Sequence, residues 1–102
     1  AVTGLKRSAA LPDIPTMDEE GLKGFNATSW FGLLAPAGTP AAVIQKVHRD
    51  TTQVMGETEV KARLYVQGLS PVVNSTADFT RQIDQELVRW AKVVAARKLQ
   101  AN

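Results

Sequence analysis

The chain has 102 residues, enough for one hydrophobic core and too few for two ordinary domains. Hydrophobic residues make up 44% and charged residues 22% of it, close to the globular average, which excludes a disordered or collagen-like chain. The absence of cysteine excludes a disulfide scaffold, thiol catalysis and thiolate-bound zinc. The net charge of +2 comes from interspersed basic and acidic residues, so we expect no nucleic-acid partner.

The first 24 residues predict an extended connector and one helical turn. Pro12 and Pro15 disfavour a helix before residue 16. Thr16 and Glu19 have the spacing of a capping box, and Gly21 can adopt the left-handed conformation that ends a turn. The carboxylates of residues 18–20 fit a helix N-terminus better than a cation site, since acidic residues favour that end of a helix in any case.

An apolar segment follows between Gly24 and Pro36. Its aromatic and small residues predict a strand over residues 25–34 that is buried on both faces. Trp30 and Phe31 in such a strand are more typical of a core than of a ligand-stacking platform. Without neighbouring strands, its edges would be unpaired, and we therefore expect the chain to self-associate.

Two helices are predicted next. Thr39 as the cap and Pro40 at the first helical position start a helix that runs to about Met55, with Gly56 as its stop. The second helix covers residues 57–67 and is followed by Gly68.

The end of the chain predicts a short strand and a long helix. Residues 71–74 fit the strand, and Ser75 or Thr76 caps the helix. Apolar residues then recur at steps of three and four along one face, which we call the apolar stripe: Phe79, Ile83, Leu87, Trp90 and Val94. This pattern predicts that Trp90 is largely buried against the helix of residues 40–55.

Residues with catalytic or metal-binding chemistry are scarce. His48, the single histidine, has no second ligand at metal spacing and no nucleophile to pair with, so we interpret it as an ordinary surface or boundary residue. The glycine-containing segments lack the spacing of a phosphate loop or a dinucleotide fingerprint. We therefore expect no catalytic residue, no metal and no cofactor.

The motifs nevertheless resemble a known family. The run Leu-Pro-Asp-Ile-Pro-Thr over residues 11–16 and the run Ser-Trp-Phe-Gly-Leu-Leu-Ala-Pro-Ala-Gly-Thr-Pro over residues 29–40 are similar to the C-terminal third of TctC or Bug proteins, the extracytoplasmic receptors of tripartite tricarboxylate transporters. Later positions agree in order and spacing: Glu59, Arg63, Gly68, Pro71, Phe79, Glu86 and Trp90.

The resemblance implies an α/β fold, as a helix-rich fragment of a two-lobed, Venus-flytrap binding protein. The expected order is strand, short helix, strand, two helices, short strand and long helix. Residues 1–27 would end the second lobe and form a connector, residues 28–36 would be a strand crossing the hinge, and residues 37–102 would be the C-terminal helical part of the first lobe. The family usually has a glycine before a final strand, where this sequence reads Ala96-Arg97-Lys98, which favours a helix continuing to about Lys98.

By the same resemblance, the intact parent would bind a small carboxylate in the periplasm and pass it to membrane transporter subunits. Most ligand loops of the family lie earlier in its sequence, so only residues near the hinge are candidates here: Asn26, Thr28, Ser29 and Trp30. The alternative is a free-standing helical module that binds a partner helix through the apolar stripe.

Overall fold

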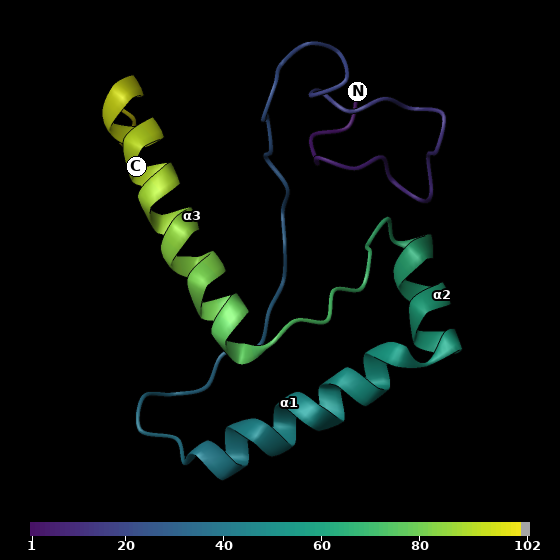
Figure 1. Cartoon of the computed structure of the whole chain (residues 1–102), viewed down its shortest axis with the longest axis vertical. Coiled ribbons are helices and arrows are strands. Elements are labelled where there is room, and N and C mark those ends of the chain that lie inside the picture. The colour runs from purple at the N-terminus through teal and green to yellow at the C-terminus, as the bar shows by residue number, and fades with distance from the viewer. Residues whose placement is uncertain (101–102) are drawn as a thin grey trace. The chain divides into compact units, whose positions relative to one another are not determined.

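A computed structural model describes residues 1–100 and contains three helices, α1 (Ala41–Gly56), α2 (Thr58–Val66) and α3 (Thr76–Arg97) (Figure 1). The chain divides into two compact units, Ala1–Val72 and the residues from Val73 onward. In the first unit α1 and α2 contact each other, and an irregular N-terminal region precedes them. The end of the predicted helical region, residues 101–102, lies outside the described residues.

The N-terminal region is tied together by a backbone clamp between residue 2 and residues 15–17. The Val2 amide donates to the Pro15 carbonyl at 2.8 Å, and the Met17 amide donates to the Val2 carbonyl at 2.9 Å. Val2 and Thr16 thereby form a parallel bridge. Thr16, with 2% of its surface exposed, is the buried residue at the centre of this N-terminal clamp.

The predicted capping box forms in this clamp. The Thr16 amide donates to Glu19 Oε2 at 2.7 Å, and the Glu19 amide donates to Thr16 Oγ1 at 3.1 Å. Arg7 Nε donates to both Glu19 carboxylate oxygens, at 3.1 and 3.0 Å. The predicted single helical turn is confirmed, since the Glu20 amide donates to the Thr16 carbonyl and Gly21 follows with a φ of 105°, but it does not extend into a helix.

The predicted strands differ from the structure. Residues 25–36 have no regular secondary structure and run as an extended trace, in blue in Figure 1. Residues 71–75 are also irregular, and the first expected strand is reduced to the bridge at Val2. The physical reason is that a strand exists only beside a hydrogen-bonding partner, and residues 1–100 supply no ladder for these segments.

Helices α1 and α2 match their predicted ranges to within one residue at each end. The predicted cap at Thr39 is wrong, because its hydroxyl donates to the Pro36 carbonyl at 2.8 Å and Pro40 takes the N-cap position without a side-chain bond. His48 is half-buried on α1. At the end of α2, Gly68 adopts a φ of 74°, and the Gly68 and Leu69 amides donate to the carbonyls of Tyr65 and Leu64 in the pattern of a Schellman motif.

Helix α3 begins and ends close to the predicted residues. Ser75 is its cap, with Oγ accepting from the Asp78 amide at 3.0 Å. Its end is formed by Lys98, a non-glycine residue in the left-handed conformation with a φ of 51°. The Leu99 amide donates to the Val94 carbonyl at 3.1 Å and closes this end.

Hydrophobic side chains are not buried anywhere in the described part of the chain. The prediction that Trp90 is largely buried is wrong for this chain, because 45% of Trp90 and 66% of Leu87 are exposed. The stripe has the helical period of a core face, but periodicity does not supply the surface that covers it. Among residues 1–100, no helix is long and apolar enough to cross a membrane.

Candidate functional site

The four candidate residues follow the N-terminal clamp and the loop of residues 18–24. The Ala27 amide donates to the Thr3 carbonyl at 2.9 Å, which joins this part of the chain to the residues next to Val2. Thr28 Oγ1 donates to Asn26 Oδ1 at 2.7 Å, so the structure brings these two side chains together. The clamp therefore fixes the start of the candidate site.

Gly4 lies beside the Thr28 side chain. A Cβ atom at residue 4 would lie 3.4 Å from Thr28 Oγ1, an ordinary van der Waals contact. The sequence prediction did not single out Thr3 or Gly4 as neighbours of the site. No local signal could have done so, because the contact joins residues more than twenty positions apart and depends on the clamp.

The site offers uncharged polar groups. Asn26 is half-buried, Thr28 and Ser29 are exposed, and Trp30 is 40% exposed. With its oxygen occupied by Thr28, the Asn26 side chain retains its amide N–H groups as donors, and Ser29 carries a hydroxyl donor. Such groups bind carboxylates through hydrogen bonds without a formal positive charge. The arrangement suits one end of an anionic ligand and has no nucleophile–base pair.

Hydrogen bonds and ion pairs hold the loop of residues 18–24 that leads to the site. Asp18 Oδ1 accepts from the Gly24 amide at 2.7 Å, and Lys23 Nζ lies 3.3 Å from Asp18 Oδ2. The Gly24 amide and the Lys23 ammonium hold the pKa of Asp18 below its ordinary value. Glu19 has a lowered pKa because of its Arg7 partner and the Thr16 amide. These carboxylates therefore serve contacts within the chain.

Asp18 and Glu19, two acidic side chains of the N-terminal region, are engaged with other groups of the chain. Within the described residues, no group of three or more histidine, cysteine, aspartate or glutamate side chains is placed to hold a metal ion. The acidic residues 18–20 share a loop, but Asp18 and Glu19 point their oxygens at amides and cationic side chains.

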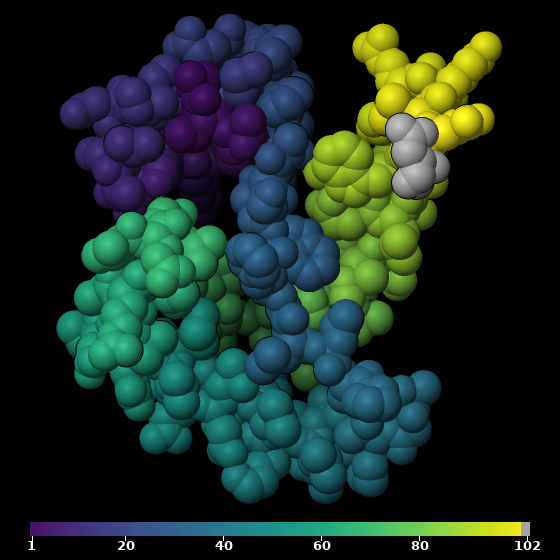
Figure 2. All heavy atoms as spheres, turned by 180° about the vertical axis from the view of Figure 1, so that it is seen from behind, coloured from purple at the N-terminus to yellow at the C-terminus, as the bar shows by residue number. Residues whose placement is uncertain are grey.

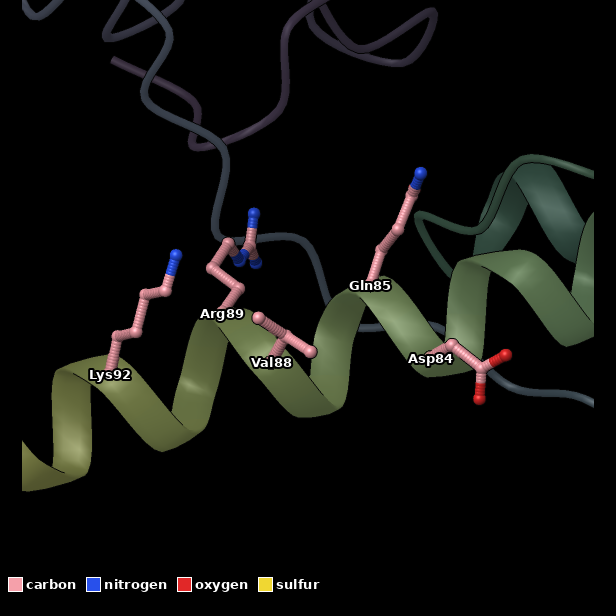
Figure 3. Close-up of a pocket in the computed structure, with 5 residues that line it drawn as sticks. All are labelled: Asp84, Gln85, Val88, Arg89 and Lys92. Atoms are coloured by element: carbon pink, nitrogen blue, oxygen red, sulfur yellow. The ribbon is translucent and has the colours of Figure 1, made fainter.

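A shallow hollow lies along α3. It measures about 440 Å³ and is lined by residues of that helix alone: Asp84, Gln85, Val88, Arg89 and Lys92. Gln85, Arg89 and Lys92 extend to one side of the helix, whereas Asp84 points the other way (Figure 3). Arg89 Nη2 lies 3.2 Å from Glu86 Oε2, and its guanidinium carbon lies 5.0 Å from the centre of the Trp90 ring. One helix face cannot converge on a small ligand from several sides.

Comparison with known proteins identifies related sequences over almost the whole chain. Residues 1–99 match the family model described as tripartite tricarboxylate transporter family receptor, TctC. Protein BugT of Bordetella pertussis is 37% identical over 95 residues, which cover 92% of this chain and 29% of BugT. A protein encoded in the tcbD–tcbE intergenic region of Pseudomonas sp. strain P51 is 30% identical over 102 residues, covering 99% of this chain and 30% of that protein.

A solved structure is similar to this chain over most of its length. The protein Rpa4515 of R. palustris, determined with adipate, superposes with a TM-score of 0.77 at 33% identity. The match covers 93% of this chain and 32% of Rpa4515. The chain thus spans about a third of the length of the proteins it resembles here.

Proposed function

Because this chain belongs to the tripartite tricarboxylate transporter receptor family, we propose that it acts as part of a solute-binding receptor that captures a small carboxylate. The observation that carries this proposal is the match over residues 1–99, supported by the shared arrangement with a protein determined with adipate. The family is one of transport receptors and not of enzymes. The match includes both the candidate site and the apolar stripe, which argues against a free-standing helical module.

The proposed ligand is a small dicarboxylate of the adipate type. In the proposal, Asn26 and Ser29 donate hydrogen bonds to one carboxylate, Thr28 orients the Asn26 side chain, and Trp30 covers part of the apolar linker between the two ends. The 2.7 Å bond from Thr28 to Asn26 supports this, because it orients the Asn26 amide N–H groups as donors. The other carboxylate would be bound by segments of the receptor outside these 102 residues.

The proposed organisation follows the receptor's two lobes. Residues 1–27 complete the second lobe and connect it, residues 28–36 cross the hinge, and residues 37–102 belong to the first lobe. In this proposal the receptor works in the periplasm and delivers its ligand to the membrane subunits of the transporter.

Isothermal titration calorimetry tests the proposed ligand. The receptor used is a chimera in which this chain replaces the corresponding third of Rpa4515, with adipate, a monocarboxylate and a neutral diol of equal length as ligands. We expect adipate to bind the chimera and not the isolated 102-residue chain, since a third of a receptor offers too few converging donors. Failure of the chimera to bind any carboxylate would contradict the proposal.

Point variants of the chimera test the assigned residues. Asn26→Ala should weaken adipate binding about tenfold or more, because a hydrogen bond to a charged group contributes about 1.5–3 kcal/mol. Thr80→Ala is the matched polar control, because the Thr80 hydroxyl donates to the Thr76 carbonyl within α3 and has no role in the site. If Asn26→Ala and Thr80→Ala weaken adipate binding equally, the assignment of Asn26 to the ligand site is wrong.

A further inference from the structure

The backbone around Ala27 is anchored to the first residues of the chain. The Ala27 amide donates to the Thr3 carbonyl at 2.9 Å, and the purple atoms of the first residues lie against the blue atoms of the segment that follows residue 24 (Figure 2). Asn26 and Thr28 flank this anchor on either side. Because Thr28 Oγ1 lies 2.7 Å from Asn26 Oδ1, the two side chains leave the anchored backbone in the same direction.

The length of this contact identifies its donor. A separation of 2.7 Å is typical of an O–H···O hydrogen bond, whereas N–H···O bonds are longer, at about 2.9–3.0 Å. The Thr28 hydroxyl is therefore the donor, and the carbonyl oxygen of the Asn26 side chain is the acceptor. The oxygen and the NH2 group of a side-chain amide point in different directions from the same carbon atom. Asn26 consequently turns its N–H groups away from Thr28, toward a ligand.

This orientation decides which chemical groups Asn26 can bind. A free amide side chain can turn end for end and offer its oxygen to an N–H group of a ligand. A carboxylate only accepts hydrogen bonds, whereas a neutral carboxamide also donates them. With its oxygen engaged by Thr28, Asn26 offers donors alone. Such a group favours an ionised carboxylate over the neutral carboxamide of the same shape.

Two cations that precede the site do not supply this selectivity. Arg7 Nε lies 3.0 Å from Glu19 Oε2, and Lys23 Nζ lies 3.3 Å from Asp18 Oδ2, so both charges are balanced within the chain. At Asn26 the distinction between a charged and a neutral ligand end therefore depends on donors and acceptors. Such a distinction can be large, because a polar group that loses its partner on binding has no hydrogen bond to replace the one it made with water.

We propose that Thr28 is a specificity-determining residue, which makes the subsite at Asn26 select ionised carboxylates and reject neutral carboxamides. Thr28 acts through Asn26 and does not bond to the ligand itself. This inference rests on the proposed function, since it takes residues 26–30 as part of the ligand site. It adds the chemical form of ligand that the site accepts and the side chain that decides it.

Two ligands of equal length test the selectivity. Isothermal titration calorimetry on the Rpa4515 chimera gives the Kd of adipate and the Kd of adipamide, in which neutral amides replace both carboxylates. Thr28→Val keeps the shape of the side chain and removes the hydroxyl, so Asn26 can turn its oxygen toward the ligand. The preference for adipate should then fall about tenfold or more, as expected for one hydrogen bond to a charged group. Thr28→Ser keeps the hydroxyl and should keep the preference.

Thr80→Val is the matched control, because it removes a threonine hydroxyl that donates to the Thr76 carbonyl within α3. It should leave the preference for adipate unchanged. If the chimera binds adipate and Thr28→Val keeps the full preference, the role given to Thr28 is wrong and the proposed function stands. Equal losses in Thr28→Val and Thr28→Ser would also overturn this role, because the hydroxyl would then not be the cause. A chimera that binds no carboxylate contradicts the proposed function, and the inference about Thr28 falls with it.

The orientation of the Asn26 side chain gives a second measurement, which needs no ligand. Three-bond couplings about the Asn26 χ1 angle, measured by NMR in the ligand-free chimera, should show one rotamer with Thr28 or with Thr28→Ser. In Thr28→Val they should show averaging between rotamers. Because the Thr28 side chain is exposed, neither substitution removes a buried contact. Averaged couplings in the presence of Thr28 would overturn the inference, even if adipate binds.

Discussion

The substitution Thr16→Val tests whether the capping box holds the N-terminal clamp. Valine keeps the size and the branched shape of the buried side chain and removes only the hydroxyl that accepts from the Glu19 amide at 3.1 Å. The second bond of the box, from the Thr16 amide to Glu19 Oε2 at 2.7 Å, is retained because it uses the backbone. Loss of a cap of this kind costs about 1 kcal/mol, which corresponds to about a fivefold increase in local opening.

Amide exchange measured by NMR reads this opening residue by residue. We expect the Glu19 amide to exchange about fivefold faster in Thr16→Val, and the Ala27 amide, which donates to the Thr3 carbonyl, to follow it if the clamp opens as one unit. Thr3→Val is the matched control, since the Thr3 side chain is exposed. Unchanged exchange at Glu19, or an equal effect of Thr3→Val, would refute the role given to the capping box.

Three other predictions concern the carboxylate network and the ends of α3. The pKa of Glu19 is lower in the folded chain than in an unfolded one. Its carboxylate therefore stabilises the clamp fully at a pH above the unfolded pKa, and this stabilisation is lost as the pH falls through the folded pKa. Amide exchange measured by NMR at acidic pH should show the clamp opening. Ser75→Ala should reduce the helicity of α3 by circular dichroism, at a cost of about 1 kcal/mol, whereas Ser75→Thr should preserve it, because the threonine hydroxyl can also accept from the Asp78 amide and donate to the Asp78 carboxylate. Lys98→Gly should stabilise the end of α3 by about 1 kcal/mol, seen in carbon chemical shifts, since glycine tolerates the φ of 51°; Lys92→Gly, within the helix, should lower helicity instead.

The helices could be predicted because their signals are local. Gly68 ends α2 in the expected left-handed conformation, and Ser75 caps α3 through a bond to an amide three residues away. Both devices work within one turn of helix and need no distant partner. Thr39 shows the limit of this reasoning. Its hydroxyl was expected to accept from an amide at the start of α1, and it donates to the Pro36 carbonyl instead.

Local pattern predicted strands and a buried apolar stripe, and residues 1–100 of the structure show neither. Phe31 and Leu34 have the composition of an interior strand, and Trp90 has the spacing of a core residue, yet all three are exposed in this chain. Residue composition and the spacing of apolar residues indicate which side chains suit a buried face. Whether they are buried depends on a neighbouring surface that covers them. The candidate site residues Asn26, Thr28, Ser29 and Trp30 came from the family resemblance. The bond from the Ala27 amide to the Thr3 carbonyl beside them depends on the fold of the clamp and has no local signal in the sequence.

The two tryptophans make the two units optically separable. Trp30 lies in the unit Ala1–Val72, and Trp90 lies in the unit that begins at Val73. Trp90 Nε1 donates to Glu86 Oε2 at 2.6 Å, and a guanidinium group lies over its ring, so its emission reports on the surface of α3. In a Trp90→Phe variant the remaining tryptophan fluorescence comes from Trp30 alone. Because Trp30 is 40% exposed, any molecule that covers it can then be followed in real time, through a shift of the emission to shorter wavelength, without any added label.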